Sequence, residues 1–287
     1  MMSRNSIFKI LITTGPILIF SVFSGLLIFL VYNLGANFID LAAGKEFTAV
    51  IFRLFKDLKD PVAGTLMIIV FSVGISTPAG IITGVYLHEY SSKKVKKHGI
   101  DLFRYLSSLP SIIIGVFGLV MIISLNHFFG SNIRTGIFIS AISLSILILP
   151  YIVHSTVNAL SMIPEPTRIT ALSLGAKKYQ NILFILLPES ISGILGGVVL
   201  SIGRAAEDTA VIMLTGAAAF AGIPSKLNDA FEALPFFIYY KSSEYQGSLE
   251  MTEIFLSSII IILISTTFIT AAGRLSGKMK KRSRGIK

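Results

Sequence analysis

The chain has 287 residues and a mean hydropathy of +0.79, with 53% hydrophobic and 14% charged residues. An ordinary soluble domain carries about 25% charged residues, so this composition excludes that class and indicates a membrane protein with several spans. The formal net charge of +10 indicates basic residues in cytoplasmic loops and against anionic lipid, rather than a nucleic-acid partner.

Six apolar segments meet or approach the ~20 residues that cross a ~30 Å hydrocarbon core. The first is longer than the ~7–15-residue apolar core of a cleaved signal peptide, so we expect it to remain in the protein. The sequence therefore predicts an all-α fold with six transmembrane helices. The predicted spans are residues 10–34, 63–87, 109–129, 135–157, 190–215 and 252–273.

Basic residues are divided unevenly between the two sides of such a protein. With the N-terminus inside, the cytoplasmic segments hold 17 Lys and Arg residues and the outside loops hold seven. The positive-inside rule then places both termini in the cytoplasm of a cell-membrane protein. We divide the chain into an N-terminal span with its outside loop (1–62), a transmembrane domain (63–275) and a basic cytoplasmic tail (276–287).

Two long segments are predicted to lie outside. The first covers about residues 35–62, and its EFTAVIFRLFKDLKD stretch has apolar residues at helical spacing. This stretch fits a helix on the membrane surface or a solvated connector. The second segment, 221–251, contains Pro224 and Pro235, so we do not expect one straight helix there.

The predicted cytoplasmic segment between spans four and five, IPEPTRITALSLGAKKYQNILFILLPES, is too long and too apolar for a simple connection. Its prolines favour a helix start near residue 165, and Gly175 allows a bend between two short amphipathic helices. Pro188 would then begin span five. Two interpretations remain open, an interfacial helix lying on the bilayer and a docking element for a partner protein.

The sequence GRAAEDTA places Arg204, Glu207 and Asp208 inside predicted span five. On a helix, both carboxylates reach back to the guanidinium, at spacings of three and four residues. An arginine at the bilayer centre costs about 2.5–3.5 kcal/mol on insertion scales, and pairing offsets part of that cost. The structural interpretation is an ion pair that fixes helix register. The functional interpretation is a substrate path, because charges inside membranes mark such paths.

The cytoplasmic segment resembles the EAA loop of ABC-transporter permeases, whose pattern is E-A-A, three residues, G, nine residues, then I-x-L-P. Ile169 and Thr170 depart from the first two positions of this pattern. The resemblance implies that residues of about 164–188 form coupling helices that dock in a groove of an ATPase subunit. The positions that match, and to which this coupling role carries over, are Ala171, Gly175, Ile185, Leu187 and Pro188.

GRAAEDTA itself resembles the G-R-A-x-G-E-T-A motif of phosphate-specific transport permeases. Glu207 stands where these permeases have Gly, and Asp208 where they have Glu. Other stretches between residues 63 and 275, including FEALPFFIYY, are similar to the A-type subunit of that family. The likeness implies a type I ABC importer permease (MetI-like) fold and a substrate path for inorganic phosphate. In this path Arg204 would attract the anion, and Asp208, with Glu207 as a second candidate, would hold the guanidinium.

The resemblance also implies the partners: a C-type permease subunit forming a heterodimer, two ATPase subunits and an extracytoplasmic phosphate-binding protein. The sequence has no G-x-x-x-x-G-K-[ST] loop, so we expect no enzyme activity and no cofactor in this chain, with ATP-Mg bound by the ATPase subunits. No metal site is expected, and His88 and His127 are interpreted as surface histidines at span ends.

Three alternatives stay open at the level of the sequence. The chain could be a permease for another oxyanion, such as molybdate or sulfate, or it could be the C-type subunit. A different class is a secondary carrier or channel that acts alone. A stable complex with an ATPase subunit would separate the importer from the carrier, which needs none.

Overall fold

The computed structural model of the protein describes residues 4–44, 47–130, 132–244 and 246–283. Six helical segments in these ranges are long and apolar enough to cross a membrane, which confirms the predicted number. The chain is therefore a multi-pass, all-α membrane protein. The segments are Pro16–Ile39, Ala49–Tyr90, Ser111–Phe129, Ile137–Ser161, Lys178–Glu207 and Ser248–Ala271.

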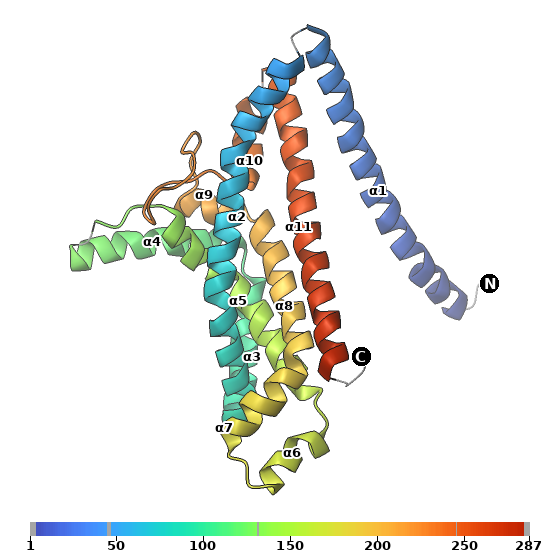
Figure 1. Cartoon of the computed structure of the whole chain (residues 1–287), viewed down its shortest axis with the longest axis vertical. Coiled ribbons are helices and arrows are strands. Elements are labelled where there is room, and N and C mark those ends of the chain that lie inside the picture. Colours follow the sequence, from blue (N-terminus) through green and yellow to red (C-terminus); the bar gives the residue numbers. More distant parts are fainter. Residues whose placement is uncertain (1–3, 45–46, 131, 245, 284–287) are drawn as a thin grey trace.

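The first two helices meet at one end of the molecule, and α1 diverges from the other helices towards its N-terminus (Figure 1). Helix α1 is Arg4–Gly44 and α2 is Phe47–Val85, so most of the segment expected as an outside loop is helical. Both interpretations of EFTAVIFRLFKDLKD are wrong, because from Phe47 onward it forms the first turns of α2. The apolar stripe of this stretch, spaced four residues apart, is buried at Val50, Leu54 and Leu58.

The core is built around α5, Ile137–Ser161, which packs along α2. Leu144, Ile148 and Ile152 of α5 are fully buried. Glycines allow a close approach of α2, because a Cβ at Gly80 would lie 2.7 Å from Ile152 side-chain atoms and one at Gly84 would lie 2.6 Å from Thr156 Cβ. Helix α5 and the C-terminal half of α2 therefore form one tightly packed pair.

Two further helices separate α2 from α5 along the chain. Helix α2 continues into a π-helical turn, η1 (Tyr86–Tyr90), and the amphipathic α3 (Lys93–Ser108) then runs beside α5. Helix α4, Ser111–Phe129, lies crosswise to α2 in Figure 1 and packs against α9. The third predicted span is thus a helix of the right length that is steeply inclined to the others.

The segment after α5 makes a compact turn at the end of the molecule opposite the α1–α2 junction (Figure 1). Helix α11 then runs back from that junction beside α1 and α8. The 221–251 region is not one straight helix, as expected. The elements are α6 (Glu165–Ser173), α7 (Lys178–Asn181), the π-helical turn η2 (Ile182–Leu186), α8 (Leu187–Glu207), α9 (Ala210–Thr215), α10 (Leu234–Glu244) and α11 (Ser248–Ser283).

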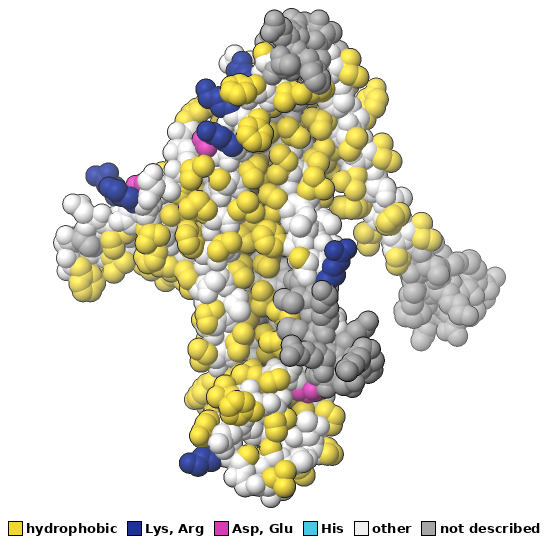
Figure 2. All heavy atoms as spheres, in the orientation of Figure 1, with side chains coloured by type: hydrophobic (Ala, Val, Ile, Leu, Met, Phe, Trp, Pro, Cys, Tyr) yellow, Lys and Arg dark blue, Asp and Glu magenta, His cyan; other side chains and the backbone are white. Residues whose placement is uncertain are grey.

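Hydrophobic side chains cover most of the long helices on the face drawn in Figure 2. Exposed large apolar residues on α1, α2 and α4 include Phe20, Val70 and Phe117. A soluble monomer rarely exposes so continuous an apolar surface. The surface therefore fits a chain whose helices face lipid or other membrane-embedded subunits.

The loop between α9 and α10 is anchored at Glu232. A Cβ at Gly64 of α2 would lie only 1.8 Å from the Glu232 carbonyl oxygen, so only glycine fits this contact. The Glu232 carboxylate accepts a 2.7 Å hydrogen bond from the backbone N–H of Phe220, whose φ of 59° is unusual for a residue other than glycine. Glu232 thus holds the loop in a strained conformation against the middle of α2.

Replacing Glu232 with glutamine is expected to remove a pH dependence of stability. Burial raises the pKa of the Glu232 carboxyl above its usual 4.5, against hydrogen bonds from Phe220 and Tyr240 that lower it. The neutral carboxyl therefore stabilises the fold, and this contribution is full below pH 4.5 and is lost as the pH rises through the raised pKa. Thermal unfolding in detergent should show the parent losing stability relative to Glu232→Gln over that range.

A matched change at exposed Glu244 of α10 serves as the control, and Glu244→Gln should follow the parent at every pH. A difference in melting temperature between the parent and Glu232→Gln that stays the same at every pH would contradict the expected effect of Glu232 on stability.

Candidate functional site

Arg204 lies in the last turn of α8, and the structure brings both predicted acids to it. Its Nη1 is 3.4 Å from Glu207 Oε1 and its Nη2 is 3.5 Å from Asp208 Oδ2. The two acids differ sharply in burial, since the Asp208 side chain is 2% exposed and that of Glu207 is 62% exposed. Asp208 is therefore the fixed partner of the guanidinium, and Glu207 is a peripheral one.

The helix predicted for residues 190–215 is interrupted at this site, which corrects the fifth span. Helix α8 ends at Glu207, Asp208 is extended with ψ 116°, and α9 begins at Ala210. Asp208 Oδ1 accepts a 2.9 Å hydrogen bond from the Val211 N–H, so its side chain caps the following helix. One carboxylate thus ends one helix, starts the next and contacts Arg204.

The guanidinium is only loosely held. Charge-assisted hydrogen bonds between arginine and carboxylates are typically about 2.7–2.9 Å, shorter than both contacts of Arg204. Arginine has five N–H donors, and its side chain is 33% exposed in this chain. Arg204 can therefore bind a further anion without losing Asp208. Interrupted backbone within a membrane is tolerated only where protein buries it or where it lines an aqueous cavity.

The second group of predicted residues lies at the other end of α8. Pro188 precedes Arg204 by 16 residues of α8, which at about 1.5 Å per residue puts roughly 25 Å between this group and Arg204. The expected helix–bend–helix form is confirmed, since Gly175 has a φ of 89° between α6 and α7. Ala171 is buried, Ile185 and Leu187 are partly buried, and Pro188 is exposed in the first turn of α8.

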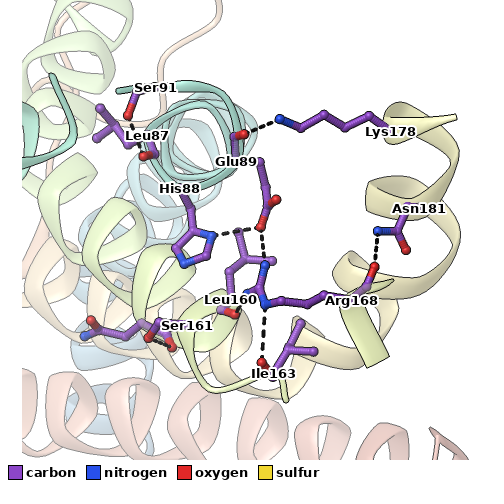
Figure 3. Close-up of polar contacts among 11 residues, drawn as sticks. Leu87, His88, Glu89, Ser91, Leu160, Ser161, Ile163, Arg168, Lys178 and Asn181 are labelled. Carbon is purple, nitrogen blue, oxygen red and sulfur yellow. Dashed lines mark hydrogen bonds and ion pairs between the residues drawn. The ribbon is translucent and has the colours of Figure 1, made fainter. Parts of the chain in front are cut away.

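A polar cluster fastens this segment to the end of α2, and Figure 3 shows its side chains. Arg168 of α6 donates to Glu89 Oε1 of η1 at 2.7 Å, and His88 Nδ1 lies 2.8 Å from the same oxygen. The His88 side chain is only 11% exposed, so its interpretation as a surface histidine is wrong. The charged pair follows the long apolar run of α2 and joins residues 79 positions apart.

Lysine and asparagine side chains of α7 complete this cluster. Lys178 Nζ donates to the Glu89 backbone carbonyl at 2.5 Å and lies 4.6 Å from the centre of the Tyr90 ring. Asn181 Nδ2 donates to the Arg168 carbonyl at 2.9 Å, across the Gly175 bend. The sequence does not indicate this cluster, because neither its spacing nor a motif pairs the end of one span with a loop two spans later.

Comparisons with known proteins agree with this architecture. The chain is 34% identical over 163 residues to the phosphate transport system permease protein PstA of Yersinia pestis, covering 55% of this chain and 52% of that protein. It is 31% identical to the PstA of Haemophilus influenzae, covering 66% of this chain and 65% of that protein. A probable ABC transporter permease, YqgI of Bacillus subtilis, is 31% identical over 55% of this chain and 52% of its own length.

This chain spans about half the length of most of these curated relatives. Solved structures share its fold at low identity. A chain of the inward-facing MetNI methionine ABC transporter matches with a TM-score of 0.57 and 18% identity, covering 75% of this chain and 93% of its own. A chain of a bacterial alginate ABC transporter complex matches with a TM-score of 0.66 and 15% identity, covering 96% and 98%.

The predicted six-span, MetI-like fold of an ABC importer permease is therefore confirmed. The sequence profile of one family, described as the binding-protein-dependent transport system inner membrane component, matches residues 76–282, from the last third of α2 to the end of α11. The chain belongs to this family of inner membrane transport components.

Proposed function

We propose that this chain is the membrane-spanning permease subunit of an ATP-driven importer of inorganic phosphate, and that it forms half of the translocation path. The observation that carries the proposal is Arg204, loosely paired with Asp208 at the break between α8 and α9, inside an apolar span. The similarity to phosphate permeases of other bacteria supports the same substrate. The chain transports and does no chemistry.

The chemistry of the site suits phosphate in particular. Its oxyanion offers acceptors to the guanidinium fork, and its P–OH group offers a donor to a carboxylate. Sulfate lacks that donor at neutral pH. Because Arg204 stands beside two carboxylates, a ligand that both accepts and donates hydrogen bonds fits better than one that only accepts. Asp208 orients the guanidinium when the path is empty, and Glu207 is the more exposed of the two acids.

The partners follow from the same proposal. A C-type permease subunit supplies the other half of the path, two ATPase subunits bind ATP-Mg on the cytoplasmic side, and an extracytoplasmic binding protein delivers phosphate. In this proposal both termini of the chain lie in the cytoplasm, as do the coupling helices of residues 164–188. The segment of residues 164–188 contacts the ATPase subunit and passes its closure to α8, and so to Arg204.

Replacing Gly175 with alanine is expected to weaken the hold of this segment on the ATPase subunit. A Cβ at this position meets no atom within 4 Å, so the cost is backbone strain alone. At a φ of 89° that strain is about 1–2 kcal/mol for a residue with a Cβ, or roughly a 5–30-fold loss of affinity if the bend is required for docking. The measurement is ATPase retention during purification of the complex.

Gly196 of α8 provides the matched control, because a Cβ there also meets nothing within 4 Å while its backbone is helical. Gly196→Ala should retain the ATPase as the parent does. Equal retention by Gly175→Ala would contradict the coupling role of the bend.

The proposal is tested by producing the chain with the C-type subunit and the ATPase subunits. We expect the chains to purify as one complex, whose ATP hydrolysis is stimulated by the phosphate-loaded binding protein and not by the empty one. A chain that purifies alone and moves phosphate without an ATPase would instead be a secondary carrier. Stimulation only by sulfate or molybdate would assign another oxyanion.

A further inference from the structure

We propose that the Glu89–Arg168 ion pair makes residues 164–188, called here the coupling segment, move as one body with the C-terminal half of α2 during transport. The inference rests on the proposed function, since it concerns how ATPase closure reaches the translocation path. It names Glu89 and Arg168 as positioning residues, which touch neither the substrate nor ATP. Along the chain, the coupling segment is connected directly only to α5 and α8. A contact with α2 therefore adds a second route by which its movement reaches the membrane helices.

The geometry of this pair is that of a strong contact. The N–O distance is 2.7 Å, and the side chains are only 16% and 12% exposed, so water screens them little. Arg168 also donates to the backbone carbonyls of Leu160 and Ile163, at the end of α5. One guanidinium therefore joins α6 to the ends of both α2 and α5. The contrast with Arg204 is clear, since its contacts are 3.4 and 3.5 Å long.

Both halves of the coupling segment share this tie. Lys178, beyond the Gly175 bend, donates to the Glu89 backbone carbonyl, and Asn181 donates to the Arg168 carbonyl. Figure 3 shows the Arg168 side chain of α6 and the Lys178 side chain of α7 reaching Glu89 of η1, while the Asn181 side chain points to the Arg168 carbonyl. The bend can therefore not open or close without breaking contacts to the end of α2.

The end of α2 is itself shaped for this contact. Glu89 lies in the π-helical turn η1, and the coupling segment contains a second such turn, η2, directly before α8. Single π-helical turns often occur at functional sites, because the extra residue redirects the side chains. N-terminal to η1, Gly80 and Gly84 of α2 pack closely against α5. Movement of the coupling segment therefore displaces the α2–α5 pair together with α8.

The first test measures phosphate uptake and ATP hydrolysis by the full reconstituted transporter carrying Glu89→Gln. We expect uptake per ATP hydrolysed to fall about tenfold, while the amount of assembled complex and the basal hydrolysis stay near those of the parent. Arg168→Gln should give the same fall. The double variant should be no worse than either single one, because both remove one interaction. Additive losses, or loss of assembly in place of coupling, would overturn the inference.

A matched control removes an ion pair of α3 that is not part of the cluster. Arg104 and Asp101 of α3 pair at 3.3 Å, with side chains 69% and 33% exposed. Asp101→Asn should leave uptake per ATP unchanged, since an exposed pair of this kind contributes little. A tenfold fall in this control would show that the assay reports general damage, and would count against the proposed link.

The second test asks whether the contact persists through the cycle. The chain has no cysteine, so Glu89→Cys/Arg168→Cys introduces the only two thiols into this subunit. Bridging them with a short, reducible bis-thiosulfonate should raise uptake per ATP towards the parent value, and reduction should lower it again. If bridging instead abolishes the remaining transport, the two elements separate during the cycle and the inference fails. The parent complex distinguishes failure of this inference from failure of the proposed function. The proposed function predicts ATP-driven phosphate uptake by the parent itself, whatever the result with the double-cysteine variant.

Discussion

Replacing Arg204 with alanine is expected to lower ATP-driven phosphate uptake about 100-fold while the transporter still assembles. A hydrogen bond to a charged group contributes about 1.5–3 kcal/mol, and each 1.36 kcal/mol is a factor of ten in rate. Arg204 would make at least one such bond to the anion in the path. The measurement is the initial rate of labelled phosphate uptake by vesicles with equal amounts of assembled complex.

Two further variants separate loss of substrate contact from damage to the helix break. Arg204→Ala leaves Asp208 buried and without its cation, so Arg204→Ala/Asp208→Asn removes that charge as well. The double variant should assemble better than Arg204→Ala and transport no better. Arg204→Lys keeps the charge without the planar fork and should retain intermediate uptake. Parent-like uptake by Arg204→Ala would exclude Arg204 from the path and favour an ion pair that only fixes helix register.

Replacing Asp208 with alanine is expected to destabilise the chain by about 1.5–3 kcal/mol. Loss of the cap on the Val211 N–H costs about 0.5–2 kcal/mol. Loss of the buried partner of Arg204 adds about 1 kcal/mol, a value reduced for the partial exposure of the guanidinium. Asp208→Asn keeps an acceptor for the cap and loses only the charge, so its cost should be about 1 kcal/mol. Unfolding of the purified chain in detergent measures both.

Glu207 supplies the control for this prediction. Its side chain is 62% exposed and its contact with Arg204 is 3.4 Å long, so Glu207→Gln should change stability by less than about 1 kcal/mol. If Glu207→Gln destabilises the chain as much as Asp208→Ala, then burial and capping do not distinguish the two acids, and the assignment of Asp208 as the fixed partner is wrong.

The membrane spans and the coupling segment were predictable because their signals are local. Apolar length gives the number of spans, and glycine at a bend between two amphipathic stretches gives the form of residues 164–188. The proximity of Glu207 and Asp208 to Arg204 also followed from helical spacing. What spacing could not show is their difference in burial, which depends on how α9 packs against α4 and α5.

The helix break and the polar cluster depend on contacts that are distant in sequence. An aspartate after a helical run can continue a helix or cap the next one, and GRAAEDTA carries no glycine or proline at the break itself. The start of α2 was misassigned for a related reason, since charged residues among apolar ones resemble a surface helix until the buried partners of Leu54 and Leu58 are known. The Glu89–Arg168 pair joins two elements that only the fold brings together.

The most direct test of the central claim is phosphate accumulation in proteoliposomes containing this chain, its permease partner and the ATPase subunits. With binding protein outside and ATP inside, we expect labelled phosphate to accumulate against its gradient, with no competition from equimolar sulfate. Removing ATP, the ATPase subunits or the binding protein should each abolish accumulation. Phosphate movement that persists without ATP, or accumulation of sulfate in place of phosphate, would contradict the account.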